Sequence, residues 1–282
     1  SGTSTLTCST GKTFKGQWII PNSLGYIAKG QFVDSKGDII HFIFGENIGQ
    51  FRGLVDSPHQ IQKIPKQHFT FPQETYQVKT GTGFFITSDG YLITNHHVIN
   101  GASKVYIKKN EKKYVAQIVD IDKENDLAIL KINILSKPIP LFSGDEIQKG
   151  TKITSFGYPL IGLQGNELKT TFGFINSISG YNDDKKYYQI DTPIQPGNSG
   201  GPIINYYGEA VGVVTSTLNQ QNTLMTQGTF TQNVNYAVKI NRLLPLLIKN
   251  NIRVISQSNS RRLNEVQLVN NYEKSVVIII AH

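Results

Sequence analysis

The stretch Pro196–Pro202 reads Pro-Gly-Asn-Ser-Gly-Gly-Pro and places one serine among three glycines. Glycine permits tight bends and lets backbone N–H groups approach a bound molecule closely. A serine that attacks a carbonyl carbon needs an exposed Oγ, and it needs nearby N–H groups that stabilise the resulting oxyanion. Ser199 is therefore a candidate nucleophile, although a loop rich in glycine and serine is also typical of an ordinary turn.

A predicted hairpin upstream of this loop ends in two adjacent histidines. Residues 83–87 and 91–94 are rich in β-branched and aromatic residues, 88–90 is a Ser-Asp-Gly turn, and His96 and His97 follow the second strand. A histidine held at the end of a buried hairpin can serve as a general base. Neighbouring side chains point in different directions, so only one of the two can face a nucleophile.

A carboxylate enters a very apolar predicted strand at Asp126, within the sequence Asn-Asp-Leu-Ala-Ile-Leu-Lys-Ile of residues 125–132. One interpretation is a polar group that caps the end of the strand. The other is a buried anion that orients a histidine and stabilises its imidazolium form.

In the order His97, Asp126, Ser199, these segments resemble the trypsin-like serine proteases. Within that family the sequence is most similar to the HtrA (DegP-type) branch, over residues of about 75–250. The matching phrases are 81–84, 92–98, 126–130, 157–159, 189–194, 197–202, 208–213 and 235–238.

The resemblance implies a serine endopeptidase. In that interpretation His97, which directly precedes Val98, is the base, and His96 is only its neighbour. Asp126 would hold the His97 tautomer while Ser199 attacks the peptide carbonyl. The backbone N–H groups of Gly197 and Ser199 would receive the oxyanion.

The resemblance also implies a pocket for the substrate residue that precedes the cut bond. Ile194 and the run Thr215, Ser216 and Thr217 would line it, and none of them is charged. We therefore expect cleavage after small or medium aliphatic residues. Asn198 stands where digestive relatives have aspartate, so activation by a new N-terminus that pairs with this side chain is not expected.

Short strands and turns alternate from Val78 to Ala237, which is typical of an all-β barrel or sandwich. The resemblance implies two antiparallel six-stranded Greek-key barrels, at about 75–140 and 141–238, with the active site in the cleft between them. Apolar residues at helical spacing predict a helix over 239–250 that ends this domain.

The flanking segments lie outside the resemblance. Residues 1–56 form a small β-rich segment with predicted strands at 13–20, 26–33, 38–44 and 50–55, and Lys-Gly-Gln-Trp at 15–18 recurs as Lys-Gly-Gln-Phe at 29–32. Residues 57–74 contain prolines and glutamines and suit a linker. Residues 251–282 form a C-terminal tail with a strand at 275–280 for which the sequence names no partner.

Composition excludes several classes of protein. Hydrophobic residues make up 38% and charged residues 17%, enough for a packed core. Cys8 is the one cysteine, so no intrachain disulfide can form. The net charge of +8 is spread along the chain, which argues against a dedicated nucleic-acid surface. No metal-ligand spacing or cofactor motif is present, and the longest aliphatic run, Val276–Ala281, is too short to span a bilayer.

Partners and location follow only from the resemblance. It implies a protein or peptide substrate, a homo-oligomer that would be a trimer, and a secreted or periplasmic location with any signal peptide absent from this sequence. Residues 251–282 are too few for the PDZ domain that often follows such proteases. The alternative hypothesis is a catalytically silent binding or scaffolding protein of the same fold, with a disordered oxyanion loop.

Overall fold

The computed structural model describes residues 2–7, 13–19, 27–34, 39–45, 78–144, 146–215, 234–255 and 260–282. The chain divides into two compact units, Ser1–Gln77 and Val78–His282. The predicted strand at 50–55 and the linker at 57–74 lie outside the described residues. Cys8 lies outside them as well.

The first unit is a four-stranded antiparallel sheet with the order β1-β2-β3-β4. Its strands are β1 (Gly2–Thr7), β2 (Thr13–Ile19), β3 (Ile27–Asp34) and β4 (Ile39–Gly45). The repeated tetrapeptides lie opposite each other on β2 and β3, where Gly16 pairs with Phe32, Gln17 with Gln31 and Trp18 with Gly30. The repeat therefore marks two paired strands, and β1 is a strand that was not predicted from the sequence.

The second unit contains two closed six-stranded antiparallel barrels, as the sequence predicted. The first barrel has the order β16-β5-β6-β9-β8-β7. Its strands are β5 (Lys79–Phe85), β6 (Tyr91–Thr94), β7 (Val105–Lys109), β8 (Lys112–Asp122), β9 (Leu127–Lys131) and β16 (Val276–Ala281). Buried aliphatic and aromatic side chains, among them Phe85, Leu92 and Leu130, fill its interior.

The second barrel has the order β10-β11-β12-β15-β14-β13. Its strands are β10 (Lys152–Gly157), β11 (Lys169–Ser177), β12 (Tyr187–Ile190), β13 (Pro202–Asn205), β14 (Ala210–Thr215) and β15 (Asn235–Lys239). Ile153, Ile175 and Val214 belong to its own core. A third apolar cluster joins residues of both barrels, including Phe84 on β5 and Phe156 on β10.

Short helices and 3-10 turns lie between or beside the barrel strands in the sequence. They are α1 (His96–Ile99), α2 (Ile161–Gln164), α4 (Leu244–Lys249), α5 (Glu265–Tyr272) and the 3-10 turns η2 (Tyr181–Asp183), η3 (Ile240–Leu243) and η4 (Glu273–Ser275). The predicted helix over 239–250 appears as η3 followed by α4. No helix in the described part of the chain is long and apolar enough to cross a membrane.

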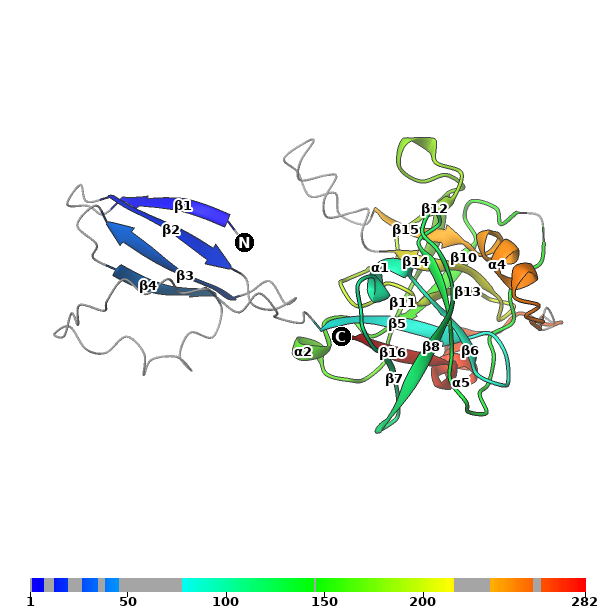
Figure 1. The fold of residues 1–282 in the computed structure, drawn as a ribbon. Helices are drawn as coiled ribbons and strands as arrows, with labels where there is room; N and C mark the ends of the chain where they lie inside the picture. The colour runs from blue at the N-terminus through cyan, green and yellow to red at the C-terminus, as the bar shows by residue number, and fades with distance from the viewer. Residues whose placement is uncertain are drawn as a thin grey trace. The chain divides into compact units, whose positions relative to one another are not determined.

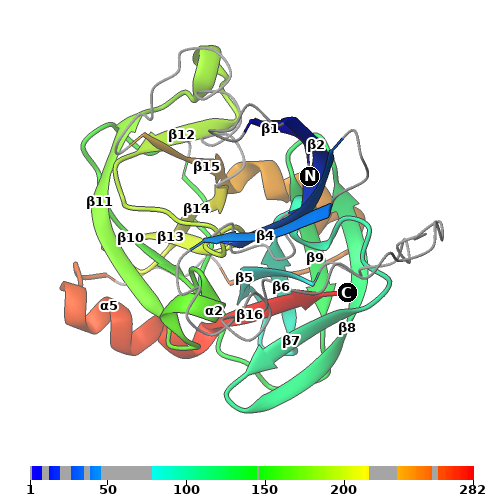
Figure 2. The same ribbon diagram turned by 90° about the vertical axis from the view of Figure 1, so that its left-hand side faces the viewer.

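The strand β16 closes the first barrel from the far end of the sequence. It pairs antiparallel with β5 from Val276 opposite Phe84 to Ala281 opposite Lys79, and it pairs with β7 on its other side. In Figure 1 the red β16 lies directly beside the cyan β5, and Figure 2 shows the same neighbours from another direction. The strand predicted at 275–280 thus has two partners, and residues that were expected to form a tail contribute to a barrel wall.

We predict that truncating a core side chain on β16 destabilises the second unit. Ile279 is fully buried, so Ile279→Ala should lower the free energy of unfolding by about 2–5 kcal/mol. The matched control is Val266→Ala on α5, whose side chain is 68% exposed and should cost about 0.5 kcal/mol or less. Urea unfolding followed by circular dichroism measures both, and similar losses in the two variants would contradict a structural role for β16.

Candidate active site

The hairpin and strand pairing of the first barrel bring His97 and Asp126 together. Thr94, the last residue of β6, pairs with Ala128 near the start of β9, so His97 just after β6 meets Asp126 just before β9. The His97 ring Nδ1 lies 2.7 Å from Asp126 Oδ2, and the His97 backbone N–H donates to Asp126 Oδ1 at 2.8 Å. These two contacts hold both the position and the rotation of the imidazole.

The backbone of Asp126 is itself held in an uncommon conformation. Its φ is +54°, in the left-handed region that residues other than glycine seldom adopt. Its carbonyl oxygen accepts hydrogen bonds from the side-chain Nδ2 of the buried Asn95, at 2.9 Å, and from the backbone N–H of His96, at 3.1 Å. The segment that presents His97 therefore also fixes the residue that orients it.

The second barrel adds a further contact to the same carboxylate. The hydroxyl of Thr215, at the end of β14, lies 3.4 Å from Asp126 Oδ2. Thr215 was expected from the sequence to line a substrate pocket, and the structure places its hydroxyl against Asp126. Ser216 and Thr217, expected in the same pocket, lie outside the described residues.

His96 has a different environment from His97. Desolvation by burial lowers the pKa of His96, and this effect outweighs the attraction of the nearby Asp126 carboxylate, which acts in the opposite direction. A lowered pKa favours the neutral imidazole near neutral pH. The ring that contacts Asp126 belongs to His97.

Ser199 lies in the segment 196–201, in which the carbonyl oxygens of residues 196–199 each accept a hydrogen bond. Pro196 O accepts from Leu160 N–H at 2.9 Å, and Asn198 O accepts from Gly201 N–H at 2.9 Å. The other two carbonyls both bind Thr82 of β5: Gly197 O accepts from the Thr82 hydroxyl at 2.7 Å, and Ser199 O accepts from the Thr82 backbone N–H at 2.8 Å.

These carbonyl contacts also determine where the N–H groups of the segment point. In a trans peptide the C=O and the following N–H are directed oppositely. The bond to Pro196 O therefore fixes the direction of the Gly197 N–H, and the bond to Asn198 O fixes that of the Ser199 N–H. The two predicted oxyanion donors thus have directions set by neighbouring groups.

Two glycines in the segment are required by its geometry. Gly197 has φ of +100°, and a Cβ at this position would lie 2.5 Å from Tyr158 O. Gly200 has φ of +86°, and a Cβ there would overlap Thr82 O and the Thr94 hydroxyl. Both positions combine a left-handed backbone with close approach of another strand or loop, which only glycine tolerates.

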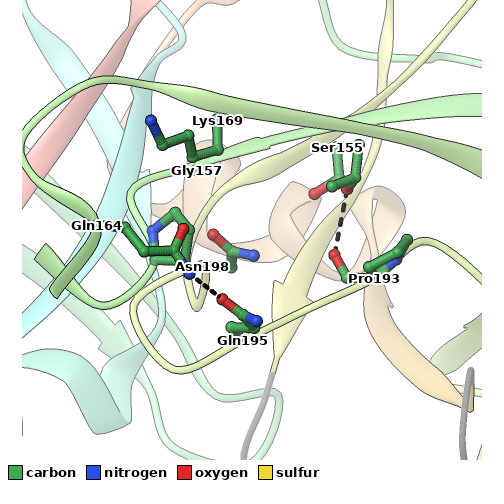
Figure 3. Close-up of a pocket in the computed structure, with 9 residues that line it drawn as sticks. Ser155, Gly157, Gln164, Lys169, Pro193, Gln195 and Asn198 are labelled. Carbon is green, nitrogen blue, oxygen red and sulfur yellow. Dashed lines mark hydrogen bonds between the residues drawn. The ribbon is translucent and has the colours of Figure 1, made fainter. Parts of the chain in front are cut away.

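A pocket of about 280 Å³ lies beside the segment that precedes Ser199 (Figure 3). It is lined by Ser155, Gly157, Pro159, Gln164, Lys169, Thr171, Pro193, Gln195 and Asn198. Gln164 Nε2 donates to Gln195 Oε1 at 2.6 Å, which ties α2 to this segment. Ile194, between two lining residues, instead packs against the core of the second barrel.

Thr82 is a site residue that was missed from the sequence, where it stood only within the phrase Gly81-Thr82-Gly83. The available signal was a polar residue between two glycines, directly before the apolar pair Phe84 and Phe85. Among the described residues, no group of three or more His, Cys, Asp or Glu side chains is placed to hold a metal ion.

Comparison with known proteins identifies the barrel unit. Residues 81–213 match the family described as the trypsin-like peptidase domain. The chain is 36% identical over 198 residues to the uncharacterized protein y4bJ of Sinorhizobium fredii, covering 70% of this chain and 31% of that protein. It is 39% identical over 181 residues to a probable periplasmic serine endoprotease, DegP-like, of Chlamydia trachomatis, covering 62% of this chain and 33% of that protein.

A solved structure supports the same assignment. The serine endoprotease from Yersinia pestis superposes with a TM-score of 0.50 at 27% sequence identity, covering 64% of this chain and 60% of that one. The barrel unit is therefore a trypsin-like peptidase domain. It is homologous to the HtrA (DegP-type) serine endoproteases, as the sequence phrases indicated. The chain spans about a third of the length of the curated relatives named above.

We predict that the contacts around Gly200, more than its backbone angle, make it irreplaceable. Gly150 has a similar φ of +79° but open space where a Cβ would go. Gly150→Ala should cost about 1–2 kcal/mol of folding free energy, the cost of a left-handed backbone. Gly200→Ala should cost roughly 2 kcal/mol more, because its Cβ meets backbone atoms. Urea unfolding of both variants tests this, and equal losses would show that the close contacts are unimportant.

Proposed function

We propose that this chain is a serine endopeptidase whose catalytic residues are Ser199, His97 and Asp126. The observation that carries the proposal is the double contact of His97 with Asp126, through the ring Nδ1 and the backbone N–H. In this arrangement the His97 Nδ1–H donates a hydrogen bond to the Asp126 carboxylate, which leaves Nε2 as the basic nitrogen. The homology to DegP-type endoproteases supports the same reaction.

The reaction proceeds in two acyl-transfer steps. His97 Nε2 takes the proton of Ser199 Oγ as that oxygen attacks the carbonyl carbon of the substrate peptide. The imidazolium then gives its proton to the amine that leaves, which produces an acyl-enzyme. Water attacks the acyl group with His97 again as base, and the acid product leaves with Ser199 restored. The Asp126 carboxylate stabilises the imidazolium.

The N–H groups of Gly197 and Ser199 are the proposed oxyanion donors. Their directions follow from the bonds that hold Pro196 O and Asn198 O. Donors fixed before the reaction stabilise the tetrahedral intermediate without reorganisation, and losing one typically costs about 10²–10³ in rate. Asn198 itself is neutral, so the segment is held by these hydrogen bonds without an ion pair at that residue.

Substrate preference is proposed from the residues expected in the pocket for the substrate residue before the cut bond. Ile194, Thr215, Ser216 and Thr217 offer no charge, which favours a small or medium aliphatic side chain. The curated DegP-like relatives are named as periplasmic, and we extend a secreted or periplasmic location to this chain. We likewise propose that the chain forms a homo-oligomer.

We predict that Ser199→Ala abolishes hydrolysis of quenched fluorescent casein and abolishes labelling by a fluorophosphonate probe. The wild-type chain should hydrolyse casein and react with the probe, because both reactions require an activated serine. Labelling of the wild type on Ser199 therefore distinguishes an enzyme from a silent binding protein of the same fold. A wild-type chain that is folded, but neither cleaves casein nor reacts with the probe, would support the silent alternative.

We predict that the two histidines differ sharply in their effect on rate. His97→Ala should lower kcat by about 10⁴- to 10⁶-fold, because it removes the base that Ser199 requires. His96→Ala should stay within about tenfold of the wild type, because the hydrogen bond from His96 to Asp126 is made by the backbone N–H, which the substitution leaves in place. Steady-state hydrolysis of a peptide substrate measures both, and similar rates in the two variants would overturn the base assignment.

We predict that a library of peptides with varied residues before the cut bond yields preferential cleavage after Val, Ala or Ile. The expected reason is the absence of charge among the proposed pocket residues. Sequencing of the products by mass spectrometry gives the preference directly. A dominant preference for Arg or Lys would refute the assignment of the pocket, although it would leave the catalytic residues in place.

A further inference from the structure

We propose that Thr82, in the first barrel, is a positioning residue for the oxyanion donors. It acts on residues 196–201 of the second barrel, the segment that carries Ser199, which we call the nucleophile segment. The inference rests on the proposed function. Thr82 is fully buried on β5. Its hydroxyl donates to Gly197 O at 2.7 Å, and its backbone N–H donates to Ser199 O at 2.8 Å. One residue thus holds carbonyls on both sides of the Asn198–Ser199 peptide.

The hydroxyl of Thr82 also accepts a hydrogen bond. The Tyr158 N–H donates to Thr82 Oγ1 at 3.0 Å. Tyr158 begins the loop after β10, and two residues later the Leu160 N–H holds Pro196 O. A single hydroxyl therefore connects the nucleophile segment to the loop that sets the direction of the Gly197 N–H. A hydroxyl can donate and accept at once, which a methyl group cannot do.

The carbonyl of Thr82 completes a link to the histidine segment. It accepts from the buried Thr94 hydroxyl at 2.8 Å, and Thr94 is the last residue of β6, three residues before His97. Thr82 thereby sits between the strand that presents the base and the loop that presents the nucleophile. Its role acts through other groups, since its own polar atoms are occupied by protein partners.

A packing role can be separated from the hydrogen-bonding role. The Thr82 methyl faces Gly201, where an added Cβ would lie 3.2 Å from Thr82 Cγ2. Thr82→Val keeps this methyl and the volume of the side chain but leaves Gly197 O and the Tyr158 N–H without the hydroxyl. Thr82→Ser keeps the hydroxyl and removes the methyl. The two variants therefore remove different halves of the same side chain.

We expect Thr82→Val to lower kcat for a peptide substrate by about 10- to 100-fold with KM within about twofold, because misplaced donors act on the transition state. Thr82→Ser should restore kcat to within about threefold of the wild type. Hydrogen exchange should accelerate at backbone amides of residues 197–201 in Thr82→Val and remain near wild type in Thr82→Ser. Thr87→Val is the matched control, since its hydroxyl also accepts a backbone N–H, from Tyr91, away from the nucleophile.

Thr87→Val should lower the melting temperature while leaving kcat unchanged. Wild-type kcat in Thr82→Val, or equal losses in Thr82→Val and Thr82→Ser, would overturn the positioning role. A folded wild-type chain that neither hydrolyses peptide nor reacts with a fluorophosphonate would refute the proposed function instead. Hydrogen exchange would still test the role of Thr82, because unchanged exchange at the amides of residues 197–201 in Thr82→Val would show that Thr82 does not hold this segment.

Discussion

The arrangement of the site depends on the carboxylate of Asp126, which receives two contacts from His97 and one from the opposite barrel. A carboxylate in this position must be ordered before it can orient anything. The left-handed backbone of Asp126, with its carbonyl bound by Asn95 and His96, supplies that order. The bonds that restrain the Asp126 backbone come from the segment that carries His97, so the two residues hold each other in place.

The second barrel contributes the loop that carries Ser199. For the proposed chemistry, the directions of its backbone N–H groups matter more than its residue composition. Glycines allow the loop to turn, but they leave it free to adopt other conformations. The bonds from Leu160, Thr82 and Gly201 remove that freedom by holding successive carbonyl groups. Leu160 and Thr82 are distant from this loop in sequence, and the barrels must pack together for Thr82 to reach the loop that carries Ser199.

Much of the site could be predicted from the sequence, because the chemistry depends on residue types in short motifs. The glycines around Ser199 and the apolar strand after Asp126 predicted the loop and the strand that the structure contains. The contacts of Thr82 and Thr215 could not be predicted, since they join residues on different barrels. The partner of β16 was missed for a related reason, because β16 pairs with a strand almost 200 residues away in the sequence. The helix α5 was missed because Leu268 and Tyr272 are its buried residues, which leaves only a weak apolar pattern in a polar stretch.

The position of β16 has a consequence for how the protein forms in a cell. The ribosome delivers the chain from its N-terminus, at about 5–20 residues per second. The first barrel lacks one wall strand until residues 276–281 emerge, after every strand of the second barrel has been made. The barrel that presents His97 and Asp126 is therefore completed after the other, and until then a partly translated chain exposes the edges of β5 and β7 that β16 later covers.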